Sequence, residues 1–157
     1  YKSTRELVHY LVDIVSKGGN FLLNVGVDGN GEIPPEGIKI MKEMGAWIKI
    51  NGEAIYETRP IAPYKEAKIC YTKHKNNGKA YAIYLNDEDE PNPPSQIMFS
   101  GIKPAKGARI SLLGHKGNLS YKRVDNGVLV TLPPSFVKNP ACEHAWTLCI
   151  SEINEKE

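Results

Sequence analysis

Residues 12–37 read VDIVSKGGNFLLNVGVDGNGEIPPEG and combine two kinds of pattern. Apolar residues before Gly18 recur at helical spacing, whereas residues 21–25 form a nearly continuous apolar run, as in a strand covered on both faces. A glycine-rich segment follows, and Pro34 or Pro35 is suited to begin another helix. The stretch therefore predicts a helix end, a buried strand, a loop and a second helix, the repeating unit of an α/β barrel or layered α/β fold.

Local signals predict the limits of the two helices. Ser3 and Glu6 have the spacing of a capping box, and the two glycines after Lys17 are suited to end the first helix. The sequence therefore predicts one helix from Ser3 to Lys17 and a second that begins at Pro34 or Pro35 and ends at Gly52, each with an apolar stripe on one side.

Three segments of this region resemble a known family. They are SKGGNFLLNVG at residues 16–26, DGNGEIP at 28–34 and GAWIKINGEAIY at 45–56. In this order and spacing they are similar to the end of the catalytic barrel of the α-L-fucosidases, family 29 of the glycoside hydrolases. The resemblance is dense as far as about residue 58 and looser beyond it. One residue departs from the family pattern, because Val27 stands where the family usually has proline.

The resemblance implies that residues 3–17, 21–25 and 35–51 are the seventh helix, eighth strand and eighth helix of a (β/α)8 barrel. A complete barrel needs about 250 residues, so most of it would lie outside this part of the chain. In the family, the nucleophilic Asp and the acid/base Glu come from earlier strands and loops, and no position here matches them. We therefore expect the C-terminal part of a larger enzyme, with no catalytic residue in this chain.

The activity implied by the resemblance is that of a retaining exo-α-L-fucosidase, which hydrolyses terminal α-L-fucose from fucosylated glycans. Such a reaction uses two carboxyl groups, so no metal or organic cofactor is expected. The resemblance also implies a periplasmic, secreted or lysosomal enzyme, and any targeting signal would precede Tyr1. The chain on its own is expected to be inactive.

Two residues are candidates for contact with the substrate. Asn24 is a polar residue at the end of an apolar strand, where a barrel opens toward its substrate. Its side chain would bind either a sugar hydroxyl or the backbone of a neighbouring loop. Asp28 lies in the next loop, and its alternative role is to shape an Asx turn while Glu32 is solvated.

Residues 59–157 change to the alternating pattern of strands. Asn76-Asn77-Gly78 and Asn126-Gly127 predict hairpin turns. Beyond the first hairpin, strands are expected at residues 96–99, 108–113, 119–124, 128–132 and 145–151. The pattern predicts an antiparallel β-sandwich over residues 59–157, following a barrel end piece over residues 1–58. The family resemblance implies the same order of domains.

The sandwich leaves two other functions open. A carbohydrate-binding module would need a flat aromatic surface, and Tyr64, Tyr84, Tyr121 and Trp146 would form either such a platform or part of the core. A purely structural or oligomerisation domain would instead present an apolar patch toward the barrel. Exposure of the aromatic rings distinguishes these alternatives.

Composition limits the classes of partner. The chain is 41% hydrophobic and 24% charged, as in a globular protein, and its net charge of +2 is too small to indicate nucleic acid or an anionic membrane surface. No apolar run approaches a membrane span. Three cysteines and four histidines show no metal-ligand spacing. The expected partners are fucosylated glycans, bound through the larger enzyme.

The apolar run at residues 21–25 would have no strand partners within this chain, because the first and seventh barrel strands would flank it. Unpaired edges and uncovered apolar faces favour association. We expect this segment to pair with a second copy, to be covered by the remaining barrel, or not to form a regular strand.

Overall fold

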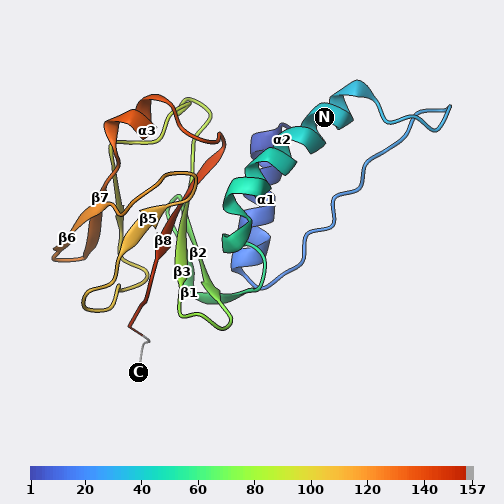
Figure 1. Ribbon diagram of the computed structural model, residues 1–157. Coiled ribbons are helices and arrows are strands. Elements are labelled where there is room, and N and C mark those ends of the chain that lie inside the picture. The colour runs from blue at the N-terminus through green and yellow to red at the C-terminus, as the bar shows by residue number, and fades with distance from the viewer. Residues whose placement is uncertain (155–157) are drawn as a thin grey trace.

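The computed structural model describes residues 1–154 (Figure 1). Helices α1 (Thr4–Ser16) and α2 (Pro35–Asn51) come first, and the short 3-10 helix η1 (Gly52–Ala54) follows. The rest of the described chain forms a short helix α3 (Pro134–Lys138) and eight strands: β1 (Thr58–Glu66), β2 (Ile69–His74), β3 (Ala80–Leu85), β4 (Gln96–Phe99), β5 (Ile110–Leu112), β6 (Ser120–Val124), β7 (Gly127–Thr131) and β8 (Ala145–Ile150).

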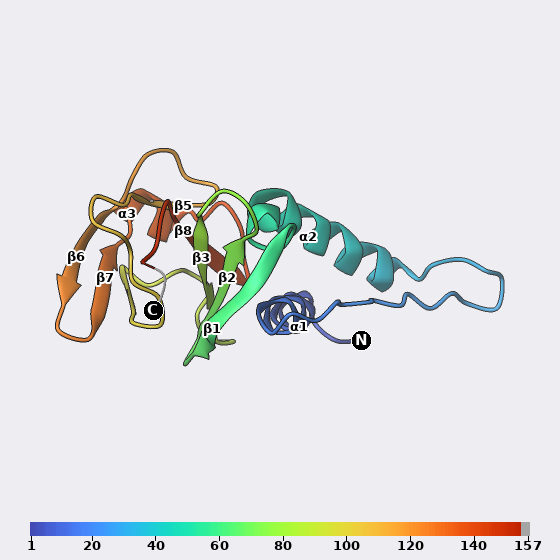
Figure 2. The same cartoon turned by 90° about the horizontal axis from the view of Figure 1, so that it is seen from below.

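The strands form two antiparallel sheets that pack face to face. One sheet has the order β1-β2-β3-β8-β5 and the other has the order β4-β7-β6. Figure 2 shows three layers, with the five-stranded sheet between the helices and the three-stranded sheet. The antiparallel β-sandwich predicted from the sequence is therefore present, and helices cover the outer face of its larger sheet.

The space between the two sheets is filled by apolar side chains. Trp146, Leu148 and Ile150 of β8 point into this core, where they meet Ile97 and Val130 of the smaller sheet. The chain packs closely where β4 ends, because a Cβ at position 127 would lie 2.3 Å from the carbonyl oxygen of Phe99. Only glycine fits at that position without moving the backbone.

A second core joins the helices to the outer face of the five-stranded sheet. Val8 and Val12 of α1 and Trp47 of α2 are buried against Tyr81 and Ile83 of β3. This face is almost entirely apolar along β3 and β8, so both faces of those strands are buried. The helical part and the sandwich therefore share one continuous apolar contact.

Several predicted elements match the structure within two residues. The Ser3 hydroxyl accepts a hydrogen bond from the backbone N–H of Glu6, and the Glu6 carboxylate accepts one of 2.8 Å from the backbone N–H of Ser3. The predicted capping box is thus confirmed. The predicted limits of the second helix, 35–51, agree with α2, and the five predicted strands after residue 95 correspond to β4, β5, β6, β7 and β8.

The predicted strand at residues 21–25 is wrong for this chain. These residues have no regular secondary structure, and the segment between α1 and α2 runs out and back beside the helices in Figure 1. Phe21, Leu23 and Val25 are half-buried, whereas Leu22 is 91% exposed. A strand is defined by hydrogen bonds to neighbouring strands, and none of the described strands pairs with this segment. Three outcomes were expected for residues 21–25: pairing with a second copy, cover by the remaining barrel, or no regular strand. The structure shows the third.

Candidate functional site

Asn24 lies on the exposed segment between α1 and α2. Its side chain is exposed and makes no hydrogen bond with any described residue. It borders a hollow of about 210 Å³ together with Leu7 of α1 and Ile40 and Met41 of α2. The amide of Asn24 is therefore accessible at the rim of a mostly apolar hollow.

Asp28 forms the Asx turn that was one of its two predicted roles. One carboxylate oxygen accepts hydrogen bonds from the backbone N–H groups of Asn30, at 2.8 Å, and Glu32, at 2.9 Å. The N–H of Asp28 donates to the carbonyl of Glu32 at 2.8 Å, which closes the loop. The N–H donors, that of Glu32 first, lower the pKa of Asp28. Glu32 is itself exposed, so Asp28 stabilises the loop while Glu32 faces solvent.

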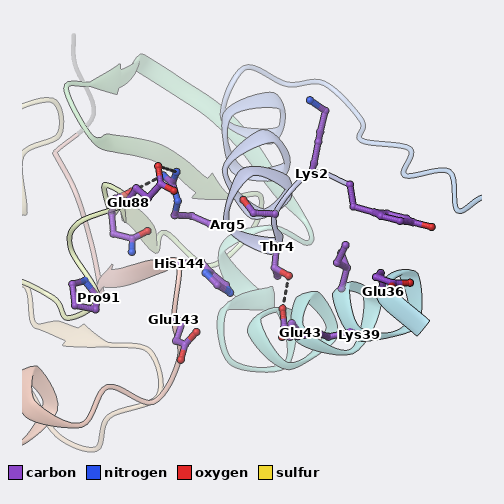
Figure 3. A pocket seen from close by; sticks show the side chains of 14 residues that line it. Lys2, Thr4, Arg5, Glu36, Lys39, Glu43, Glu88, Pro91, Glu143 and His144 are labelled. Carbon is purple, nitrogen blue, oxygen red and sulfur yellow. Dashed lines mark hydrogen bonds and ion pairs between the residues drawn. The ribbon is translucent and has the colours of Figure 1, made fainter. Parts of the chain in front are cut away.

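A larger hollow of about 580 Å³ opens beside the start of α1 (Figure 3). It is bordered by α2, the loop after β3 and the residues before β8. Its lining carries both signs of charge: the basic residues are Lys2, Arg5 and Lys39, and the acidic residues are Glu36, Glu43, Glu88 and Glu143. The Thr4 hydroxyl donates a hydrogen bond to Glu43 and so connects the two helices. This hollow could not be predicted from the sequence, because its residues come from four separate segments.

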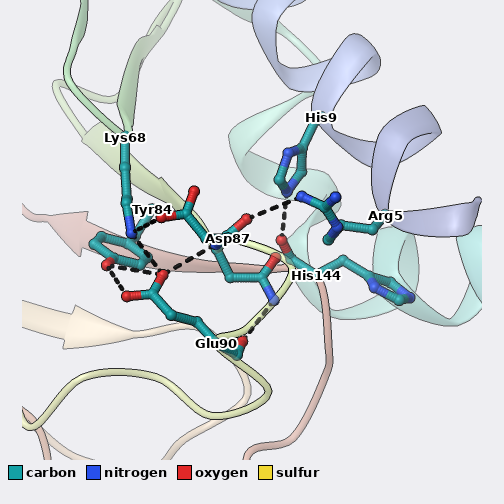
Figure 4. A network of polar contacts seen from close by, with 8 residues as sticks. Arg5, His9, Lys68, Tyr84, Asp87, Glu90 and His144 are labelled. Carbon is teal, nitrogen blue, oxygen red and sulfur yellow. Dashed lines mark hydrogen bonds and ion pairs between the residues drawn. The ribbon is translucent and has the colours of Figure 1, made fainter.

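A polar network beside this hollow fixes the acidic loop after β3 (Figure 4). Lys68 forms ion pairs with Asp87 and with Glu90, the latter at 2.8 Å, and these carboxylates raise the pKa of Lys68. The Tyr84 hydroxyl donates to Glu90 at 3.2 Å. Arg5 of α1 donates to the backbone carbonyl of Asn86 at 3.4 Å. The network therefore ties the loop to both the sheet and α1.

Two histidines meet where α1 contacts the start of β8. Nε2 of His9 lies 2.8 Å from the backbone carbonyl oxygen of His144 and donates a hydrogen bond to it (Figure 4). Burial lowers the pKa of both imidazoles below the ordinary value of 6.5. Both rings are therefore predominantly neutral at pH 7 in the folded protein.

The four aromatic residues considered as a sugar platform do not form one. Trp146 is fully buried and stacks on Tyr84 with ring centroids 6.2 Å apart and an interplanar angle of 28°. Tyr121 is half-buried, and its hydroxyl donates to the carbonyl of Ala108 at 2.6 Å. Of the four, only Tyr64 is exposed. Trp146, Tyr84 and Tyr121 thus belong to the core and its margin.

Among residues 1–154, no three His, Cys, Asp or Glu side chains form a group suited to hold a metal ion. Within the same residues, no helix has both the length and the apolar character needed to cross a membrane.

Two family models match successive parts of the chain. Residues 1–53 match the model described as α-L-fucosidase, and residues 64–151 match the model described as α-L-fucosidase C-terminal domain. The chain is similar to the plasma α-L-fucosidase of Homo sapiens, with 34% identity over 98% of the chain and 33% of the relative. It is also similar to the tissue α-L-fucosidase of Mus musculus, with 33% identity over 95% of the chain and 32% of the relative. The chain spans about one third of the length of these curated relatives.

Solved structures show the same arrangement. The α-fucosidase of Thermotoga maritima in complex with a mechanism-based inhibitor superimposes with a TM-score of 0.80 and 27% identity, over 96% of this chain and 34% of that one. The α-L-fucosidase isoenzyme 1 of Paenibacillus thiaminolyticus superimposes with a TM-score of 0.74 and 26% identity, over 99% of this chain and 35% of that one. The chain therefore belongs to the α-L-fucosidase family, and it carries the C-terminal domain of that family together with the helical segment that precedes it.

Proposed function

We propose that the protein containing this chain is a retaining α-L-fucosidase that hydrolyses terminal α-L-fucose from glycans. The observation that carries the proposal is the succession of the two family matches along one chain. In the proposed enzyme, residues 1–58 would complete the catalytic barrel, and the sandwich domain would begin at residue 59. The apolar contact between α1, α2 and the five-stranded sheet would hold the last part of the barrel in place.

The chemistry requires two carboxyl groups about 5–5.5 Å apart. One attacks the anomeric carbon and forms a fucosyl ester, while the other protonates the leaving oxygen and then activates water. In the proposed enzyme both groups come from barrel strands outside this chain. The two exposed carboxylates of the loop, Asp28 and Glu32, are assigned no catalytic role, because the Asp28 carboxylate already accepts two backbone hydrogen bonds.

Within this chain, Asn24 is the proposed contact with the sugar. Its exposed amide has no partner among the described residues, and it would stand at the substrate end of the eighth barrel strand. Asp28 would keep the following loop in one conformation, so that Asn24 is presented in a defined direction. Asn24 would thus bind the substrate, and Asp28 would be a positioning residue.

The activity is tested with the whole protein and an aryl α-L-fucoside. Proton NMR should show α-L-fucose as the first product, because double displacement retains the anomeric configuration. Turnover of an aryl β-D-galactoside serves as the control for general glycosidase activity. Release of β-L-fucose first, or cleavage of the galactoside alone, would contradict the proposal.

The two site residues are tested in the same protein. Asn24→Ala should lower kcat/KM by about ten- to a hundredfold if its amide bonds the sugar in the transition state. Asp28→Asn keeps an oxygen acceptor for the turn. Its kcat/KM should therefore be closer to that of the natural protein than the kcat/KM of Asp28→Ala. Unchanged kcat/KM in Asn24→Ala would remove Asn24 from the site without affecting the assignment of the activity.

A further inference from the structure

The charges of the sandwich are unevenly distributed. Residues 103–123 contain six basic residues and no acidic one, and all six are exposed: Lys103, Lys106, Arg109, Lys116, Lys122 and Arg123. They lie before β5, in the turn between β5 and β6, and on β6 itself. We call these six residues the basic edge. The loop after β3, by contrast, contains four consecutive acidic residues at positions 87–90.

Backbone contacts hold the segments of the basic edge together. One guanidinium nitrogen of Arg123 donates to the carbonyl oxygens of Pro104, at 2.7 Å, and Ala105, at 3.3 Å. The N–H of Leu119 donates to the carbonyl of Ile110 at 2.7 Å, which joins the start of β6 to β5. A hollow of about 580 Å³ lies at this edge, with Lys103, Arg123 and Asp125 in its lining. The segment before β5 and strand β6 therefore lie side by side and carry five of the six basic residues.

Within the described part of the chain, none of the six basic groups forms an ion pair with a carboxylate. Three basic residues near the helices and the acidic loop do form such pairs. Lys17 and Lys65 both pair with Asp13, and Lys68 pairs with Asp87 and Glu90. The six groups of the basic edge are therefore free of ion pairs with described carboxylates, and Asp125 is the one acidic residue in the lining of the hollow beside Lys103 and Arg123. The basic edge thus carries a net positive charge.

We propose that the basic edge binds anionic polysaccharides, through the sulfate or carboxylate groups of the sugar chain. Lysine and arginine on separate turns suit a linear polyanion, and arginine can donate two parallel hydrogen bonds to one sulfate. The choice of a glycan rests on the proposed function, which makes glycans the molecules that this protein meets. Single-stranded nucleic acid fits less well, because it needs exposed aromatic rings, and the one Tyr, Phe or Trp side chain within residues 103–123, Tyr121, is half-buried.

Binding can be measured on this chain without any hydrolysis. Chondroitin sulfate, hyaluronan, neutral dextran and a single-stranded DNA are titrated against the chain at low and at moderate salt. We expect binding to chondroitin sulfate that weakens as salt is raised, because bound polyanions release counterions. The only anionic groups of hyaluronan are carboxylates, so comparing its affinity with that of chondroitin sulfate shows whether sulfate groups are needed for binding. Neither polysaccharide contains fucose, so the result is independent of fucosidase activity.

A matched pair of variants tests the location. The triple variant Lys103→Gln, Lys106→Gln and Lys122→Gln should bind chondroitin sulfate about tenfold more weakly. The control variant Lys42→Gln, Lys49→Gln and Lys75→Gln removes the same charge from exposed positions outside the edge and should bind like the natural chain. Circular dichroism establishes that both variants are folded.

Three results would overturn the proposal. They are absence of binding to both anionic polysaccharides, equal weakening in the two triple variants, and binding of DNA as tight as that of chondroitin sulfate at the same salt concentration. Loss of fucosidase activity in the whole protein would leave this test unchanged, so the failure of one proposal is distinguishable from the failure of the other.

Discussion

The indole N–H of Trp47 donates a hydrogen bond of 3.0 Å to the backbone carbonyl of Ala145, the first residue of β8. Trp47 belongs to α2 and is 2% exposed, and Ala145 is fully buried. The bond therefore joins the helical part to the central region of the sandwich across 98 residues of sequence. It is a specific polar contact within a mostly apolar interface, which the hydrogen bond from His9 to His144 also crosses.

Trp47→Phe should destabilise the chain by about 1–3 kcal/mol, because it removes the donor from a buried carbonyl. The Cys142 thiol, at 3.5 Å, would remain as a weak donor to the same oxygen. The free energy of unfolding is measured by urea denaturation followed by circular dichroism. Tyr56→Phe, at a position 60% exposed, is the control. Equal stability of the two variants would show that the contact contributes nothing.

The chain should become less stable as the pH falls below 6.5. Burial lowers the pKa of His9 and His144 in the folded state, so the unfolded chain binds more protons in that range. The free energy of unfolding is therefore highest above the ordinary pKa of 6.5 and falls as the pH drops toward the lowered values. Arg5 and Lys65 oppose protonation of His9, whereas Glu43 and Glu143 favour protonation of His144.

His9→Asn should reduce this dependence between about pH 7.5 and about pH 5.5, because one of the two groups no longer titrates. Denaturation curves at a series of pH values measure the slope. Asn92→Ala, at an exposed loop position without a titratable side chain, is the control and should have the slope of the natural chain. A slope that is the same in His9→Asn as in the natural chain would contradict the assignment.

Features that depend on neighbouring residues could be predicted from the sequence, and so could the antiparallel sandwich, whereas the pairing of a particular segment with distant strands could not. The Ser3–Glu6 capping box and the limits of α2 follow from neighbouring residues, and both are present. The strand at residues 21–25 depends on hydrogen bonds to other strands, which the described chain does not supply. Helix α3 was missed, although Pro133 and Pro134 are a recognisable start signal.

The candidate site divides in the same way. The Asx turn of Asp28 was predictable because its donors lie two and four residues away. The charged hollow beside α1 could not be predicted, because Arg5, Glu43 and His144 come together only through the packing of the helices on the sheet. The basic edge was missed because the net charge of +2 averages over acidic and basic regions.

The exposed apolar segment should make the isolated chain associate with itself. Leu22 is 91% exposed between the half-buried Phe21 and Leu23, and apolar surface of this kind favours contact with a second copy. Sedimentation velocity at increasing concentration should show dimers or larger species. Leu22→Glu should shift the population toward monomer, whereas Asn92→Glu, which adds the same charge at an exposed loop position, should not. A monomer at every concentration would contradict this prediction.

In the proposed enzyme both catalytic carboxyl groups lie outside this chain, so the chain alone should not hydrolyse an aryl α-L-fucoside. The measurement is the rate of aglycone release by the purified 157-residue chain, compared with buffer and with the whole protein. We expect the whole protein to hydrolyse the fucoside and the chain to match the buffer. Turnover by the chain that is lost in Asp28→Ala or in Glu32→Ala would contradict this assignment, because it would place catalysis in the loop between α1 and α2.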